Sequence, residues 1–226
     1  MRSDRVATRL FPRAPHRSPA GDDAALFEVA DGAPVWIHDF GMVAGDLGEF
    51  RMERLREVFQ EAFLRVWRGE AENDDFNRLV LGAQFTWREV ALLRAYAKYM
   101  KQAGVAFSQA YMEHTLSAYP GVARKLVELF QARFEPTRAG DRGATQQSIV
   151  AAIKGDLEAV ANLDDDRILR QFLALIQATL RTNYHQPGGD GEPKTWISFK
   201  FDPARIPGLP EPKPAFEIFV YSPRME

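Results

Sequence analysis

Side chains that could act as acids, bases or metal ligands occur in three short stretches of the sequence. These stretches are His38-Asp39, Asp164–Asp166 and Tyr184-His185. His38 and Asp39 end an apolar run that alternates like a β-strand, so we expect their side chains to point to opposite faces. They therefore cannot hydrogen-bond to each other as an acid–base pair. A turn cap or a buried polar partner is the simpler interpretation of the two residues.

The acidic run Asp164–Asp166 could suggest a calcium or magnesium site. Hard cations need oxygen ligands that converge in a loop, whereas these carboxylates directly precede a helical pattern. The positive end of the helix dipole favours acids at that position, so we interpret the run as a helix cap. Tyr184-His185 follows the expected end of the same helix, where a protonated histidine is favourable. The four histidines lie far apart, without the short spacings of a zinc site.

The sequence contains no recognisable motif for nucleotide binding or for a catalytic nucleophile. The glycine-rich stretches 138–144 and 185–193 do not join an expected strand to a helix, as a phosphate-binding loop must. The chain has no G-x-S-x-G elbow and no cysteine nucleophile. The proline-rich stretch 208–214 could occupy a proline-binding groove, but a stiff spacer between two strands is the interpretation that we favour. No catalytic, cofactor-binding or metal-ligating residue is therefore assigned.

Composition describes an ordinary soluble globular protein. The chain has 226 residues, of which 46% are hydrophobic and 27% charged, and its net charge of −2 creates no general attraction for nucleic acid. The absence of cysteine excludes a disulfide framework and fits a reducing cytoplasm. No apolar run approaches the roughly 20 residues that a membrane helix needs. We expect a cytoplasmic protein that binds neither nucleic acid nor a membrane.

The periodicity of apolar residues predicts strands at both ends and helices between them. Residues 1–23 are basic, rich in proline and without a period, so we expect a disordered or loosely held arm. Short strands are expected at 24–29 and 34–40, joined by a turn that contains Asp-Gly. Two further strands are expected at 196–201 and 216–221. Their partner strands should come from the N-terminal runs, another chain or further sequence, because a strand pair alone is barely stable.

The helices are located by their caps and breakers. The expected helices start near Glu49, after Asp74, after Thr86, after Ser108, at Pro120, at Thr145 and after Asp166. Thr86 and Glu89 form a capping box, and Gly69 and Gly104 end two of the helices. The stretch 135–144 is expected to be a mobile loop, and the last helix should run over 168–184 as a central helix. The fold class is therefore α+β and mainly helical, a bundle of six to seven helices flanked by short strands.

Several long stretches resemble the large NAD-specific glutamate dehydrogenases of bacteria. They read PVWIHDF at 34–40, EAFLRVWRGEAENDDFNRLVLGA at 61–83, FTWREVALLRAYAKYMKQAGVAFSQAYMEHTL at 85–116, DDRILRQFLALIQATLRTNYHQ at 165–186, and SFKFDPARIPGLPEPKPAFEIFVYSPRME at 198–226. The resemblance covers nearly everything from residue 34 onward, and the first 33 residues fit it less well. Runs of this length are far more specific than a short motif.

The resemblance implies a segment immediately upstream of the catalytic domain. Residues 24–46 would end an ACT-like β module, 47–186 would form a helical domain, and 187–226 would be a strand pair that leads into a catalytic domain absent from this chain. The family's catalytic lysines and dinucleotide loop have no counterpart here, so the segment would hold no cofactor, while the parent enzyme would oxidise L-glutamate with NAD. Its partners would be the catalytic and regulatory domains of the same polypeptide, further copies in a homo-oligomer and an amino-acid effector.

Two alternatives belong to other functional classes. A free-standing helical interaction module would add its aromatic strand edge to the sheet of a partner. A small enzyme of another kind would need a polar pocket with perturbed carboxylates, and the sequence shows no such pattern.

Overall fold

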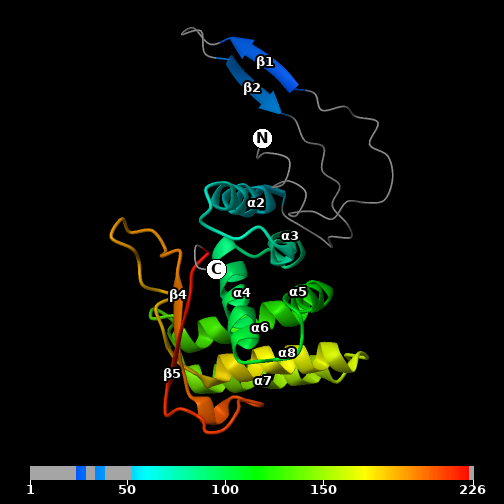
Figure 1. The fold of residues 1–226 in the computed structure, drawn as a ribbon, viewed down its shortest axis with the longest axis vertical. Helices are drawn as coiled ribbons and strands as arrows, with labels where there is room; N and C mark the ends of the chain where they lie inside the picture. The colour runs from blue at the N-terminus through cyan, green and yellow to red at the C-terminus, as the bar shows by residue number, and fades with distance from the viewer. Residues whose placement is uncertain (1–23, 29–33, 39–51, 224–226) are drawn as a thin grey trace.

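The computed structural model describes residues 24–28, 34–38 and 52–223 (Figure 1). This part of the chain contains seven α-helices, which are α2 (Met52–Trp67), α3 (Arg78–Gly82), α4 (Trp87–Gln102), α5 (Gln109–Ala118), α6 (Pro120–Phe134), α7 (Arg142–Leu157) and α8 (Leu163–Ala178). The strands are β1 (Ala24–Glu28), β2 (Pro34–His38), β3 (Thr179–Thr182), β4 (Ile197–Phe201) and β5 (Glu217–Tyr221), and two 3₁₀ turns, η1 (Asp75–Asn77) and η2 (Pro203–Arg205), complete the set. The expected mainly helical α+β class is confirmed.

The predicted helix caps define most helix starts. Thr86 accepts a hydrogen bond from the backbone N–H of Glu89, whose carboxylate accepts one from the Thr86 N–H at 2.9 Å, so the capping box is confirmed. Ser108 caps α5, and Pro120 is the first residue of α6. Asp74 caps η1 instead of starting an α-helix directly. Local side-chain chemistry thus sets where these elements begin.

Helix α7 begins earlier than its apolar pattern indicates. Asp141 accepts hydrogen bonds from the backbone N–H groups of Gly143 and Ala144, so the helix starts at Arg142 and not at Thr145. The connection between α6 and α7 is correspondingly shorter than the expected loop at 135–144.

Helix α8 starts at Leu163, earlier than the predicted start after Asp166. Asn162 is the N-cap, because its side-chain oxygen accepts hydrogen bonds from the N–H groups of Asp164 and Asp165. The acidic run Asp164–Asp166 therefore lies inside the first helical turn and does not precede the helix. The helix dipole still accounts for its charge.

Helix α8 ends earlier than predicted. The expected helix at 168–184 stops at Ala178, and the chain continues as strand β3. Thr179 pairs with Phe201 of β4, and Arg133 donates to the carbonyl oxygens of Gln177 and Thr179 at 3.3 and 2.9 Å. Tertiary hydrogen bonds thus satisfy the carbonyls that a longer helix would have used itself.

Strands β3, β4 and β5 form an antiparallel sheet in that order, with Thr182 opposite Phe199 and Phe199 opposite Phe219. The expected strand pair therefore gains its third strand from this chain. Strands β1 and β2 are confirmed as strands, but they form a separate antiparallel sheet and do not complete the C-terminal one. The turn between them and the N-terminal arm at 1–23 lie outside the described residues.

Helix α4 is the most buried helix of the described part of the chain. Twelve of its residues are buried, among them Tyr96 and Tyr99 with no exposed surface. Figure 1 shows α4 upright beside β4 and β5, with α6, α7 and α8 running across it. None of the described helices has the length and apolar character needed to cross a membrane.

Candidate functional site

The sequence candidates do not come together in one site. The backbone of His38 lies in β2, whereas Asp39 is outside the described residues. Asp165 is buried and accepts a hydrogen bond from the Thr115 hydroxyl at 2.8 Å, which ties α8 to α5. Within the described part of the chain, no three acidic or histidine side chains are placed to hold a metal ion. The acidic run is therefore a structural feature of α8.

Tyr184 and His185 follow strand β3 and not a helix end, which corrects their predicted environment. The Tyr184 ring packs edge-on against Phe130 at 5.0 Å, and His185 packs against the same ring. Burial lowers the pKa of the His185 imidazole, so the neutral form is favoured in the fold. The expected charge interaction with a helix dipole is absent for this residue, because α8 ends at Ala178.

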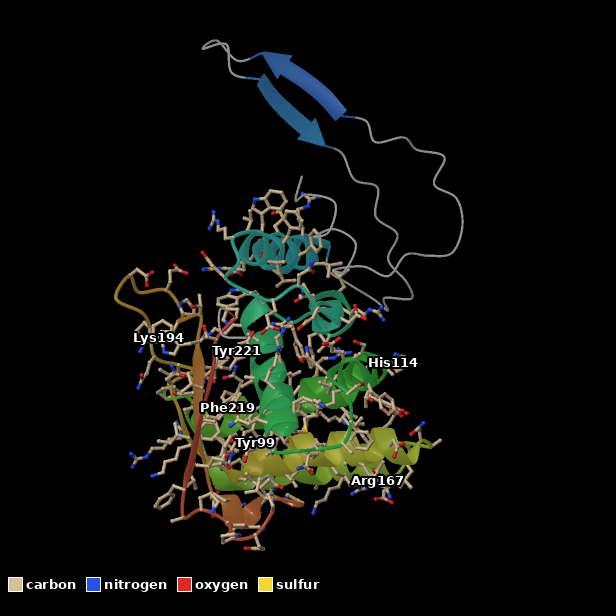
Figure 2. The ribbon with its side chains drawn as sticks, in the orientation of Figure 1. Tyr99, His114, Arg167, Lys194, Phe219 and Tyr221 are labelled. Carbon is tan, nitrogen blue, oxygen red and sulfur yellow. The ribbon has the colours of Figure 1, made fainter. Side chains whose placement is uncertain are left out.

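The most concentrated set of side-chain contacts lies between α4 and the inner face of the sheet. Tyr96 stacks on Phe199 with ring centroids 4.4 Å apart and ring planes within 10°. Tyr99 lies 4.4 Å from Phe201 and 5.5 Å from Phe219. Figure 2 shows Tyr99, Phe219 and Tyr221 in the space between α4 and β5. We refer to this layer of five rings, Tyr96, Tyr99, Phe199, Phe201 and Phe219, as the aromatic layer.

Two hydroxyl groups of the aromatic layer form hydrogen bonds to the sheet. The Tyr99 hydroxyl donates to the Glu217 carboxylate at 2.6 Å, and the Tyr96 hydroxyl lies 2.9 Å from the Thr179 hydroxyl. Burial raises the pKa of both phenols, and the Glu217 carboxylate raises that of Tyr99 further. Both phenols therefore remain protonated at neutral pH and serve as fixed hydrogen-bond partners.

Two buried arginines of α4, Arg88 and Arg94, bind backbone carbonyls or a carboxylate. Arg88 donates to the carbonyl oxygens of Lys194 and Tyr184, and burial lowers its pKa. Arg94 has no exposed surface and donates to both Asp74 oxygens at 2.6 and 2.7 Å. Burial lowers the pKa of Arg94, but Asp74, Tyr221 and Glu72 together outweigh that effect and raise the pKa. The guanidinium groups of Arg88 and Arg94 thus take part in contacts that stabilise the fold.

The arginines are the important residues that the sequence analysis did not single out. Arg88, Arg94 and Arg133 look like ordinary solvent-exposed residues of a helix, since arginine is rarely buried unless paired. One signal was available for Arg94, because it lies between Leu93 and Ala95 in an almost continuously apolar stretch of α4. Its partner Asp74 is 20 positions away, so the pairing itself required the structure.

The described residues do not fit a dinucleotide cofactor. Strands β3, β4 and β5 are antiparallel, and the glycine-rich stretch 185–193 joins β3 to β4 instead of a strand to a helix. The Tyr99 hydroxyl of the aromatic layer lies beside the Glu217 carboxylate, but burial and that carboxylate raise its pKa, so it is held as a phenol and is not activated as a nucleophile. What the arrangement can do is hold a sheet rigidly on a helix.

Comparison with known proteins assigns both partners of this contact to one enzyme family. Residues 71–136 match the family model described as "Glutamate dehydrogenase, helical motif 3", and residues 152–226 match "Bacterial NAD-glutamate dehydrogenase, catalytic domain". The second match starts within α7, whereas the resemblance suggested that the catalytic domain lies outside this chain and that residues 187–226 only lead into it. Helix α4 therefore comes from the first matched segment and the sheet from the second.

Curated relatives give the same assignment. The chain is 49% identical over 199 residues to the NAD-specific glutamate dehydrogenase of Pseudomonas aeruginosa, 46% over 197 residues to that of Halomonas elongata, and 43% over 205 residues to that of Mycobacterium tuberculosis. Each match covers 87% of this chain but 12% of the relative, so the chain spans a small part of the length of these enzymes. The chain belongs to the family of the large NAD-specific glutamate dehydrogenases of bacteria.

Proposed function

We propose that this chain is a non-catalytic segment of a large NAD-dependent glutamate dehydrogenase, and that its helices hold a sheet of the catalytic region in place. The whole polypeptide would oxidise L-glutamate with NAD⁺ and water to 2-oxoglutarate, ammonium, NADH and a proton. The NAD site and the catalytic residues would lie elsewhere in that polypeptide. The enzyme would work in the cytoplasm.

The observation that supports this role is the continuity of the hydrophobic core. Buried residues of the helical segment, such as Leu92 and Tyr96, belong to the same cluster as Ile197 and Phe199 of the sheet. Since cores are close-packed, a displacement of α4 would be transmitted to the sheet and not absorbed between them. The helical segment would therefore position the sheet, and would not act as a flexible linker.

The partners that we propose for the segment come from the family resemblance. They are the remaining catalytic and regulatory parts of the polypeptide, further copies in a homo-oligomer and an amino-acid effector whose signal the helices would relay. A free-standing interaction module is the alternative, and the exposed outer face of the sheet is the observation in its favour.

The test is an activity assay on the purified 226-residue chain. L-glutamate and NAD⁺ are added and NADH formation is followed by absorbance, with the full-length Pseudomonas aeruginosa relative as the positive control. We expect no turnover by the chain, because its described residues form no arrangement that would bind NAD⁺ beside the substrate or activate water. Measurable turnover that co-purifies with the chain would contradict the non-catalytic role.

A further inference from the structure

The outer face of the sheet, on the side away from α4, carries a ridge of large apolar side chains. The exposed fractions are 45% for Trp196, 61% for Phe216, 71% for Ile218 and 42% for Val220. We call these four residues the outer ridge. With full side-chain areas of roughly 150–250 Å², they expose about 400 Å² of apolar surface, a patch of the size that usually marks a functional contact.

Both faces of β5 are apolar, which is unusual for an antiparallel sheet that faces water. Such a sheet normally alternates between apolar residues towards the core and polar residues towards solvent. In β5, Phe219 and Tyr221 are buried against α4, yet Ile218 and Val220 between them are also apolar. This pattern is typical of a strand that is covered on both faces.

The charged side chains that the described strands place on the outer face, and the lysine beside Trp196, are all positive. The Lys200 ammonium lies 3.9 Å from the centroid of the Phe216 ring, and the Lys194 ammonium lies 5.6 Å from the Trp196 ring. Arg181 of β3 is exposed and pairs in register with Lys200. Glu217 is the one acid among the described strand residues of this sheet, and it bonds to Tyr99 on the inner side.

This charge pattern discriminates between possible occupants. A second copy of the chain would bring cations towards cations with no acid to compensate them. A helix with an apolar stripe and acidic flanks would cover the ridge and pair with the cations at the same time.

We propose that the outer ridge is the docking site of an amphipathic helix with acidic flanks, supplied by the rest of a longer polypeptide. The curated relatives provide ample length for such a helix, because the chain spans 12% of them. The proposal rests on the proposed function, in which this chain is one segment of a large enzyme. It adds the chemistry of the element that covers the second face of the sheet.

A single engineered thiol can test the docking, because the chain has no cysteine. Ile218→Cys places the thiol on the ridge, and Ala151→Cys places a control thiol on the exposed surface of α7. The reaction rate with Ellman's reagent is measured alone and with two helical peptides of about 18 residues. Both peptides carry the same leucine stripe, flanked by glutamates in one and by lysines in the other.

We expect the acidic peptide to slow the labelling of the ridge thiol at least tenfold at saturation, and the basic peptide to leave it unchanged. Lys200→Glu should weaken the protection by the acidic peptide at least tenfold, because it reverses one of the cations. Lys154→Glu on α7 makes the same charge change away from the sheet and should have no effect. The control thiol at position 151 should react at the same rate throughout.

Each of the following results would overturn the proposal. If both peptides protected the ridge thiol equally, or if neither protected it, the charge argument would be wrong. Protection by phosphatidylserine vesicles would indicate a membrane contact, and protection by raising the protein concentration alone would indicate a second copy. The same thiol can be measured in the full polypeptide that carries this chain. If it reacts there as fast as in the chain alone, the rest of the polypeptide does not supply the docking helix. These outcomes are separate from the activity assay, which tests the proposed function by itself.

Discussion

Replacing Phe199 by alanine should destabilise the helical segment and the sheet together. Phe199 has no exposed surface and stacks on Tyr96 at 4.4 Å. A buried Phe→Ala substitution costs about 3–5 kcal/mol, and the fit of this ring between Tyr96 and Phe130 puts the expected loss near the middle, at about 4 kcal/mol. With a urea m-value of about 2.5 kcal/mol/M, the unfolding midpoint should fall by about 1.5 M.

The assay follows urea unfolding with two probes that report different parts of the core. Far-ultraviolet circular dichroism reports the helices, and near-ultraviolet circular dichroism reports the packing of the aromatic layer. We expect the two curves to coincide in the unaltered chain and in the variant, because a shared core unfolds in one transition. Phe216→Ala is the matched control, since that ring is 61% exposed and its loss should cost less than about 1 kcal/mol.

The reasoning would be refuted by a variant in which only one probe shifts. If the aromatic signal moved to lower urea while the helical signal stayed in place, the sheet would be unfolding independently of α4. A loss below about 1 kcal/mol for Phe199→Ala would equally contradict the packing described here.

Three further perturbations test the polar contacts around the layer. Tyr99→Phe removes the hydrogen bond to Glu217 and should lower the free energy of unfolding by about 1–2 kcal/mol. In a double-mutant cycle with Glu217→Gln the two losses should not add, and strictly additive losses would mean that the bond contributes nothing. Arg94→Met leaves a carboxylate without its buried partner and should cost about 3–5 kcal/mol, whereas Arg167→Met, on the exposed surface of α8, should cost less than about 0.5 kcal/mol. Burial lowers the pKa of His185 below 6.5, so the unfolded chain binds the proton more readily. Stability should therefore fall as the pH drops through 6.5 towards the lower pKa of the folded state, and His185→Phe should remove this component from the pH dependence of urea unfolding.

Elements with local chemical signals were predictable from the sequence. The Thr86–Glu89 capping box, the Ser108 cap and Pro120 each act within one helical turn, so the residues that decide the structure are neighbours in the sequence. The alternation in β4 and β5 was visible for the same reason.

The boundary between α8 and β3 was not predictable in this way. The residues from Ile168 to Tyr184 keep a helical apolar pattern, and nothing local ends the helix at Ala178. The strand forms because Phe201 pairs with Thr179 and because Arg133, from another helix, binds the last carbonyl groups. These partners lie at least 22 positions away in the sequence, so tertiary contacts override the local pattern.

The contacts of the candidate site could not be predicted from the sequence pattern either, for a different reason. Tyr96 and Tyr99 were recognisable as inward-facing or aromatic helix residues, but their stacking partners lie about one hundred positions further along the chain. The contact between a helical segment and a catalytic-region sheet becomes visible only when the two are brought together in space.

Hydrogen exchange of the native chain tests most directly whether α4 and the sheet form one unit. Mass spectrometry or NMR would compare the free energies of opening for backbone amides in α4 and in β4 under conditions where exchange reports equilibrium opening. The shared core predicts that the slowest amides of both elements exchange through the same global unfolding, with free energies that agree within about 0.5 kcal/mol. Amides of β4 that open several kcal/mol more easily than those of α4 would contradict it, because the sheet would then be only loosely attached to the helices.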